Sequence, residues 1–227
     1  MNQSQVAFST PAMVANYADD TPRKVPGLPD LHRMAMLLLS EQSQPAAHIL
    51  VVGAGGGLEL KAMADARPEW VFTGIDPSAA MLDIARRTIE PFNDRIALIE
   101  GTVAAAPSGL FDGATCLLTL HFLDKSERLH LLKQIHRRLK PDTRLVVAHH
   151  SVPGGTAQHW MARSAAFADR AGVDWEKAAA SAERMAVLPL LSLADEEALL
   201  CEAGFRDVEL FYAAFSFRGW VATAAAD

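Results

Sequence analysis

The sequence predicts an α/β fold: a seven-stranded, mostly parallel sheet with helices on both faces and a helical cap inserted after the fifth strand. Three observations predict it. Apolar runs of strand length alternate with helical apolar spacing, a glycine-rich turn follows the first run, and two alanine-rich helical patterns interrupt the alternation once. Such alternation is typical of βαβ units, whose helices cover a parallel sheet. With 227 residues, 50% of them hydrophobic, the chain can form one domain with a sizeable core.

The first 150 residues divide into a polar arm and a region of alternating strands and helices. Residues 1–30 are polar and proline-rich, so we expect a loose arm or lid. Residues 31–150 are expected to form the central domain. Its expected helices cover residues 31–41, 57–66, 78–88 and 125–139, and its expected strands cover 48–52, 70–75, 95–100, 111–120 and 144–149.

The remaining residues are expected to add a cap and to complete the sheet. Two alanine-rich patterns within residues 151–191 predict a helical cap over the carboxyl ends of the strands. Residues 192–227 begin with a capping-box pattern at Ser192 and contain a helix stop at Gly204. We expect a helix over 194–203 and an antiparallel pair of strands over 206–213 and 215–224.

The turn after the first strand indicates a site for a nucleotide-like ligand. Gly53, Gly55 and Gly57 permit positive φ and close approach of a ligand, and the following helix offers unpaired N–H groups. A dinucleotide site requires a third glycine at the position of Leu58, so the spacing disfavours NAD. Asp76 ends the second strand, where a carboxylate accepts hydrogen bonds from both hydroxyls of a ribose. The alternative is a glycine-rich turn that only connects two elements.

These features resemble the S-adenosylmethionine (SAM) site of class I methyltransferases, in which residues 31–150 would be the SAM-binding core. The resemblance implies two departures from the family pattern, because Thr102 and Val51 stand where the family usually carries acids. The cofactor-binding residues that it implies are Tyr17, Arg23, Gly53, Ala54, Gly55, Gly57, Asp76, Pro77, Met81, Thr102, Val103 and Leu118.

Within that superfamily the chain is most similar to the carboxy-SAM synthase group, which serves the modification of wobble uridine in tRNA. The similarity is carried by segments 23–27, 118–128, 139–141, 203–205 and 215–220. The tyrosine, asparagine and arginine that the group uses for its extra carboxylate correspond here to Leu28, Leu117 and Leu199. Leucine cannot pair with a buried carboxylate, so the sequence predicts ordinary SAM as the cofactor.

Three histidines at strand ends are the candidate catalytic residues. His121 follows the fourth strand, and His149 and His150 end the fifth. Any of them could act as a base or orient the nucleophile for methyl transfer. Side chains alternate along a strand, so only one of His149 and His150 can face the site, and the other is expected to pack elsewhere. In the cap, His159, Trp160 and Trp175 are candidates for the substrate pocket, or residues that only pack the cap onto the sheet.

Composition limits the partners. A net charge of −6 argues against a nucleic-acid surface. No apolar run is long enough to span a membrane, and the first residues lack the pattern of a secretory signal, so a cytoplasmic protein is expected. Two cysteines suggest neither a disulfide nor a metal site.

The leading hypothesis is a SAM-dependent methyltransferase that acts on a small, fairly apolar acceptor, as a monomer or a homodimer. The alternatives are a relative of carboxy-SAM synthase, a SAM-binding protein without catalytic activity, and, last, an NAD-dependent reductase.

Overall fold

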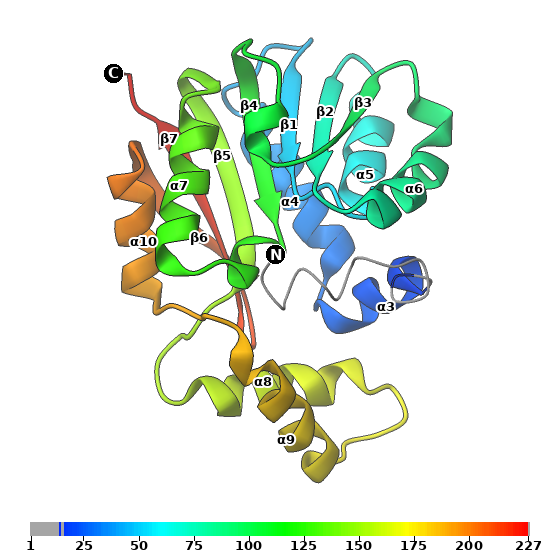
Figure 1. The fold of residues 1–227 in the computed structure, drawn as a ribbon, viewed down its shortest axis with the longest axis vertical. Coiled ribbons are helices and arrows are strands. Elements are labelled where there is room, and N and C mark those ends of the chain that lie inside the picture. The colour runs from blue at the N-terminus through cyan, green and yellow to red at the C-terminus, as the bar shows by residue number, and fades with distance from the viewer. Residues whose placement is uncertain (1–13, 15, 227) are drawn as a thin grey trace.

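The computed structural model describes residue 14 and residues 16–226. It confirms the expected fold: one seven-stranded sheet with helices on both faces (Figure 1). The strand order is β3-β2-β1-β4-β5-β7-β6, and every neighbouring pair is parallel except the two that involve β7. The strands are β1 (His48–Val52), β2 (Val71–Asp76), β3 (Ile96–Glu100), β4 (Phe111–Leu117), β5 (Leu139–His150), β6 (Phe205–Ala214) and β7 (Phe217–Ala224).

Helices connect these strands and cover both faces of the sheet. The described α-helices are α3 (Tyr17–Lys24), α4 (Leu28–Ser40), α5 (Leu58–Ala66), α6 (Ala79–Thr88), α7 (Lys125–His136), α8 (Ala157–Ala168), α9 (Trp175–Arg184) and α10 (Leu193–Glu202). Four single turns of 3₁₀-helix follow other elements: η1 (Glu90–Phe92), η2 (Val103–Ala105), η3 (Leu120–Phe122) and η4 (Met185–Val187). None of the helices described is long and apolar enough to cross a bilayer.

The alternation of side chains along β1 divides the core into two layers. Ile49 and Val51 pack on the side of α4 and α5, whereas Leu50 and Val52 pack on the side of α7 and α10. All four are almost fully buried, as expected for a central strand of a parallel sheet. The layers hold the carboxyl ends of β1 and β4 side by side. The strand order reverses between these two strands, and ligands bind at such switch points in open α/β sheets.

The N-terminal arm is more ordered than expected where the structure describes it. Residues 17–24 form α3, and α4 begins at Leu28 rather than at residue 31. Leu28 is buried in the core, and the hydroxyl of Tyr212 donates a hydrogen bond to the carbonyl of Pro26. These contacts attach the arm to the sheet. The rest of the expected arm, residues 1–13 and 15, lies outside the described residues.

Two strand ends differ from the expectation. The fourth strand ends at Leu117, because Leu118 has a φ of 57° and η3 follows. The fifth strand begins at Leu139 rather than at residue 144, so residues 140–142 lie within it. Asp142 has a φ of 64°, and the register with β4 shifts here, so the segment is an irregularity of the strand.

The inserted helices α8 and α9 pack against each other and lie at the end of the molecule where α3 and the carboxyl ends of the parallel strands meet (Figure 1). α8 also contacts α3. Ser164 of α8 is buried, and its hydroxyl lies 2.6 Å from that of Ser216, in the turn between β6 and β7. The cap is therefore attached both to the arm and to the antiparallel end of the sheet.

Candidate cofactor and acceptor site

The glycine turn after β1 is held against β2. The amides of Gly53 and Ala54 both donate hydrogen bonds to the carbonyl of Ile75, at 2.8 and 2.9 Å. Gly53 has a φ of 75°, and a Cβ added to it would lie 2.0 Å from Oγ1 of Thr119. A side chain at this position would collide with Thr119, so the turn requires glycine here. Gly53 and Gly55 form a cradle of bare backbone that lines a cavity.

Asp76 fixes the other side of this cradle. Its Oδ2 accepts a hydrogen bond from the amide of Gly55, and its Oδ1 accepts one from the amide of Ser78, both at 2.9 Å. Burial raises the pKa of Asp76, although these two hydrogen bonds act in the opposite direction. A carboxylate has about four lone-pair sites, so Asp76 can hold both loops and still accept hydrogen bonds from two ribose hydroxyls.

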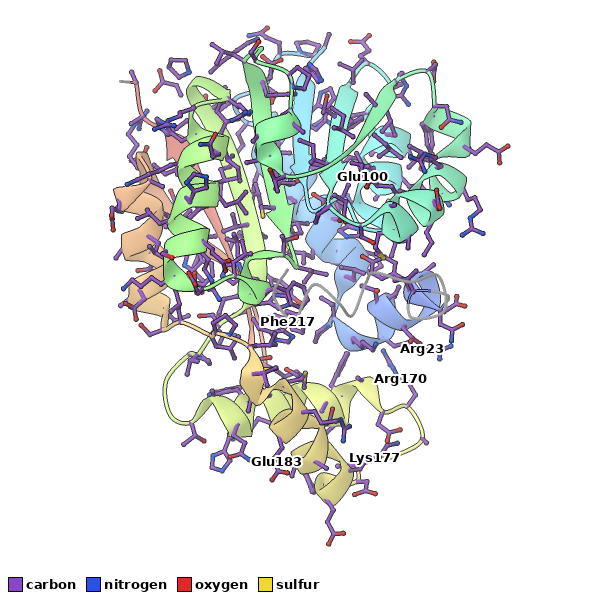
Figure 2. The ribbon with its side chains drawn as sticks, viewed as in Figure 1. Arg23, Glu100, Arg170, Lys177, Glu183 and Phe217 are labelled. Atoms are coloured by element: carbon purple, nitrogen blue, oxygen red, sulfur yellow. The ribbon has the colours of Figure 1, made fainter. Side chains whose placement is uncertain are left out.

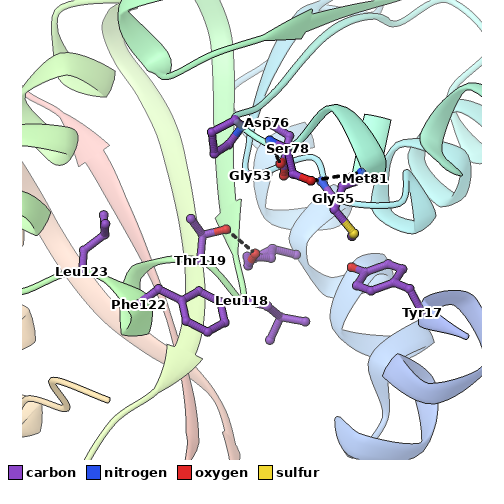
Figure 3. Close-up of a pocket in the computed structure, with 12 residues that line it drawn as sticks. Tyr17, Gly53, Gly55, Asp76, Ser78, Met81, Leu118, Thr119, Phe122 and Leu123 are labelled. Carbon is purple, nitrogen blue, oxygen red and sulfur yellow. Dashed lines mark hydrogen bonds between the residues drawn. The ribbon is translucent and has the colours of Figure 1, made fainter. Parts of the chain in front are cut away.

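A cavity of about 700 Å³ opens over these residues (Figure 3). Tyr17 and Met81 lie on one side of it, and Phe122 and Leu123 on the other. No Lys or Arg is among the described residues that line it. The lining residues are Tyr17, Gly53, Gly55, Asp76, Pro77, Ser78, Met81, Leu117, Leu118, Thr119, Phe122 and Leu123.

A second cavity of about 750 Å³ adjoins the first, since the two share Tyr17, Leu118 and Phe122. Leu118 has a positive φ, a strained conformation for a non-glycine residue that is typical of functional sites. Its backbone is held by a 2.6 Å hydrogen bond from its amide to the carbonyl of Ala148. The remaining lining residues are Val14, Asp20, Thr21, Lys24, Val25, His121, His150 and Phe217, the last at the start of β7 (Figure 2).

Two of the three candidate catalytic histidines meet in the wall of the second cavity. The rings of His121 and His150 pack edge to face, with centroids 4.9 Å apart. Nδ1 of His150 lies 2.7 Å from the hydroxyl of Ser216, which in turn contacts Ser164 of the cap. Burial lowers the pKa of His150 to about 3, and burial together with the neighbouring histidines lowers the pKa of His121 well below its usual range. Both imidazoles are therefore neutral at pH 7.

The expectation for His149 as a catalytic residue requires correction. Its side chain is on the other face of β5, where Nε2 lies 3.0 Å from Oε1 of Glu196 and the ring packs against Trp220. Glu196 also pairs with the fully buried Arg128. Burial raises the pKa of Glu196, but His149 and Arg128 outweigh burial and bring the pKa below its usual value. His149 thus belongs to a buried charged cluster between β5, α7 and α10.

The structure also corrects the substrate residues expected in the cap, because none of them lines either cavity. His159 is exposed. Trp160 donates a hydrogen bond from Nε1 to the carbonyl of Gly154, and the guanidinium of Arg163 stacks on its ring at 4.3 Å. Trp175 is 59% exposed at the start of α9. His159 and Trp175 are thus exposed on the cap, whereas Trp160 is half-buried, with the guanidinium of Arg218 from β7 also 5.8 Å from the centre of its ring.

Of the expected cofactor residues, five lie outside the first cavity. Arg23 is exposed on α3 (Figure 2). Gly57 starts α5 with a φ of 80°, and an added Cβ would meet Ala85 of α6, so this glycine permits helix packing. Thr102, after β3, is exposed, and Val103 is buried in the core. The loop that carries them is nevertheless held near the site, because the amide of the preceding residue, Gly101, donates a hydrogen bond to the carbonyl of Asp76. The fifth, Ala54, lines a smaller recess beside the cavity.

The comparisons with known proteins agree with this geometry. A family profile described as a methyltransferase domain matches residues 49–142. The chain is 33% identical over 115 residues to a demethylmenaquinone methyltransferase from Symbiobacterium thermophilum, with 48% of this chain and 45% of that protein aligned, so it spans about half of that relative. It is 25% identical to a carboxy-S-adenosyl-L-methionine synthase from Geobacter sp., over 92% of this chain and 89% of that protein.

Solved structures show the same fold. The mitomycin 7-O-methyltransferase superposes with a TM-score of 0.68 at 19% identity, over 99% of this chain and 61% of that one. Human N-acetylserotonin methyltransferase, solved with SAM, superposes with a TM-score of 0.61 at 18% identity, over 99% of this chain and 63% of that one. Residues 49–142 thus match a methyltransferase domain, and the fold is that of the class I methyltransferases. SAM is accordingly the cofactor of this methyltransferase site.

The residues present fit that cofactor. Gly53 and Gly55 line the cavity without side chains, so a ligand can lie against their backbone, and Asp76 offers lone pairs for a ribose diol. Sequence reasoning missed Ser78, Thr119, Phe122 and Leu123 as lining residues of this methyltransferase. Their signal was position alone, since they follow β2 and β4 in the chain, and β4 is one of the two strands at the switch point.

Proposed function

We propose that the protein transfers the methyl group of SAM to a small, fairly apolar acceptor that binds in the second cavity. The observation that carries this proposal is the junction of the two cavities at Tyr17, Leu118 and Phe122. A cofactor cavity that adjoins a second cavity through shared residues brings a donor and an acceptor into contact, as an in-line displacement requires.

The walls of the second cavity indicate the kind of acceptor. Val14, Val25 and Phe217 are buried apolar side chains, which favour a flat or aliphatic body. The polar groups of the inner wall are the neutral imidazoles of His121 and His150, and a charged pair, Asp20 and Lys24, lies at the α3 side. An aromatic or alicyclic acceptor would match these walls if its ring lay against the apolar side chains and one hydroxyl or amine pointed toward the histidines.

When bound, SAM supplies an electrophilic methyl group on a sulfonium. The protein's residues have to bind the acceptor, exclude water and orient its nucleophile. Nδ1 of His121 is buried and has no hydrogen-bond partner among the described residues. A neutral imidazole can accept the hydrogen bond of an acceptor hydroxyl and so direct the oxygen lone pair toward the methyl group. Ser216 fixes the ring of His150, against which His121 packs.

Methyl transfer can be tested directly. The protein is incubated with SAM carrying a deuterated methyl group and a panel of small phenols, quinols and arylamines, and products are identified by mass spectrometry. We expect labelled product from at least one apolar hydroxylated acceptor, and loss of both product formation and S-adenosylhomocysteine binding in Asp76→Ala. An Asp76→Ala variant with unaltered affinity for S-adenosylhomocysteine would contradict the assignment of the site.

A carboxy-SAM synthase activity is the second candidate, because the Geobacter relative aligns over most of both chains. The cavity disfavours it. Leu117 lines the cofactor cavity, Leu199 is buried in the core, and the described lining has no cation for an additional carboxylate. Incubation with SAM and prephenate, followed by a search for a carboxylated cofactor, separates the two activities. Firm binding of SAM without transfer to any acceptor would instead favour a non-catalytic SAM-binding protein.

We further propose that residues 151–191 form a cap that closes the acceptor cavity, held by the contact of Ser164 with Ser216.

We also propose that the protein works in the cytoplasm. The two cysteines, Cys116 and Cys201, are free thiols, as is usual in a reducing compartment. A homodimer without nucleic acid is the assembly we propose, and light scattering of the purified protein tests it.

A further inference from the structure

A buried carboxylate without a counter-charge lies beside the cofactor cavity. Glu59 is in the first turn of α5 and is 6% exposed. Its Oε1 has no hydrogen-bond partner among the residues that the structure describes. Glutamate is almost never buried to this degree unless it is paired, because a carboxylate without partners is strongly destabilised. The position of Glu59 therefore requires a functional explanation.

The carboxylate faces a recess that adjoins the cofactor cavity. The recess has a volume of about 300 Å³ and shares Tyr17, Gly53, Leu117 and Leu118 with that cavity. Gly53 and Ala54, at the end of β1, form the part of its wall where the resemblance places the methionine portion of SAM. Glu59 thus lines a small extension of the site at its amino-acid end.

The strand itself supplies no acid at this end. Val51 occupies the position at which the superfamily commonly carries one, and its side chain is fully buried in the apolar layer toward α4 and α5. The amino group of the methionine portion carries a positive charge, which a site of this kind has to compensate. Among the residues that the structure describes, Glu59 is the carboxylate that lines the recess.

The other titratable groups around Glu59 leave its charge uncompensated. From α4, His32 faces the same recess, and burial lowers its pKa to about 4, so it is neutral at pH 7. From α3, the phenol of Tyr17 has its pKa raised to about 12, chiefly by burial. From β4, burial raises the pKa of the Cys116 thiol, and Thr115 contributes an uncharged hydroxyl. No cation among these groups pairs with Glu59.

We infer that Glu59 binds the ammonium group of the cofactor's methionine portion and replaces the acid that β1 lacks at Val51. This inference rests on the proposed function, since it assumes that SAM occupies the first cavity. The carboxylate has moved from the strand end to the first turn of the following helix.

This assignment makes cofactor binding depend on pH. Burial raises the pKa of Glu59 to about 7, so at pH 6 most of the free protein carries the neutral acid. Pairing with an ammonium group requires the ionised form, and binding then releases a proton. Affinity for a ligand with the ammonium group is expected to rise about tenfold between pH 6 and pH 8.

Calorimetry with two ligands tests the inference. S-adenosylhomocysteine carries the ammonium group, and 5′-methylthioadenosine lacks the whole amino-acid portion. For Glu59→Gln we expect an affinity for S-adenosylhomocysteine at least about tenfold lower than wild type, with a flat pH profile, because a charge-assisted hydrogen bond is lost. Affinity for 5′-methylthioadenosine should change less than about twofold. Asp65→Asn, an exposed change of the same charge on the same helix, is the matched control and should leave both affinities unchanged.

Three outcomes are distinguished. Equal affinity of Glu59→Gln and wild type for S-adenosylhomocysteine overturns the inference and leaves the proposed function intact. Equal losses for both ligands also overturn it, because they indicate a general disturbance of the site. A wild-type protein that binds neither ligand overturns the proposed function. Thermal unfolding without ligand checks the fold of the variant, which should be at least as stable as wild type because the substitution removes a buried acid.

Discussion

The ring of Tyr17 lies directly on the backbone of Gly56. A Cβ added to Gly56 would be 2.6 Å from Cδ1 and 2.7 Å from Cε1 of this ring, closer than any real side chain could approach. Gly53, Gly55 and Gly57 all have positive φ, but Gly56 does not. This residue is therefore glycine to leave space for the tyrosine, and the contact joins α3 to the cofactor loop.

Substitution Gly56→Ala is expected to displace the ring of Tyr17 and to weaken binding of S-adenosylhomocysteine by about tenfold, since an overpacked methyl group typically costs about 1–3 kcal/mol. In a Tyr17→Ala background the same substitution should have little further effect, because the colliding ring is gone. Gly109→Ala is the control, as a Cβ there meets nothing within 4 Å. Additive losses in the double variant would contradict the contact.

Substitutions of the three histidines are expected to affect different properties of the protein, either catalysis or stability. His121→Ala and His150→Ala are expected to lower kcat by about tenfold or more and to leave the affinity for S-adenosylhomocysteine unchanged, because they line the acceptor cavity. His149→Leu should lower the melting temperature, since it disturbs the cluster with Glu196, and leave kcat per folded molecule nearly unchanged. Steady-state kinetics with unfolding curves measure both. A kcat defect confined to His149→Leu would reverse the assignment.

The fold was largely predictable from the sequence, and the exceptions have local causes. Strand ends followed from apolar runs, but the run through Leu118 continues past the point where its backbone leaves the strand. The composition of a segment does not reveal a strained φ that tertiary contacts impose. The polar, proline-rich arm contains a helix because the ring of Tyr17 packs on a glycine far away in the sequence.

The site was predictable in part. Asp76 and the glycine turn follow from spacing, because the end of a buried strand fixes their place. The sequence did not decide which face of the sheet His149 points to, because β5 could present either of two adjacent histidines to the site. Glu59 could have been found from one signal: an acid in the first turn of the helix, next to a strand that lacks the usual one. The spacing of apolar residues along the helix would by itself place such an acid on the face of the helix that contacts solvent.

Removal of either member of the buried ion pair between Arg128 and Glu196 is expected to destabilise the fold. The guanidinium also donates hydrogen bonds to the carbonyls of Leu123 and Pro189. Removal of one partner of a buried pair costs about 3–5 kcal/mol, because the other charge is left uncompensated. We expect Glu196→Ala to lose stability of that order in urea unfolding. Glu202→Gln, at an exposed pair with Lys133, should change stability by less than about 1 kcal/mol, and equal effects of the two would contradict the account.

Stability should fall in mild acid because of buried neutral histidines. The pKa values of His32 and His150 are lowered by burial to about 4 and about 3, from an ordinary value of 6.5. Below pH 6.5 the unfolded chain takes up protons that the folded chain does not, so each histidine costs about 1.4 kcal/mol per pH unit down to its folded pKa. Glu59 acts in the opposite direction between pH 7 and 4.5, because its pKa is raised.

The histidine effect is measured as the melting temperature of the ligand-free protein between pH 7.5 and pH 5. We expect the melting temperature to decrease, and to decrease less in His150→Asn, which lacks one of the titrating groups. A melting temperature that rises on acidification, or an equal slope in the variant, would show that these histidines do not determine the acid response.

A crystal structure with S-adenosylhomocysteine is the sharpest test of whether the cradle formed by the glycine turn and Asp76 binds the cofactor. We expect both ribose hydroxyls on the carboxylate of Asp76, the amino-acid portion against Gly53 and Ala54, and the sulfur directed toward Leu118 and the second cavity. A structure in which the compound binds elsewhere, with Asp76 turned away from it and the glycine turn closed, would contradict the account.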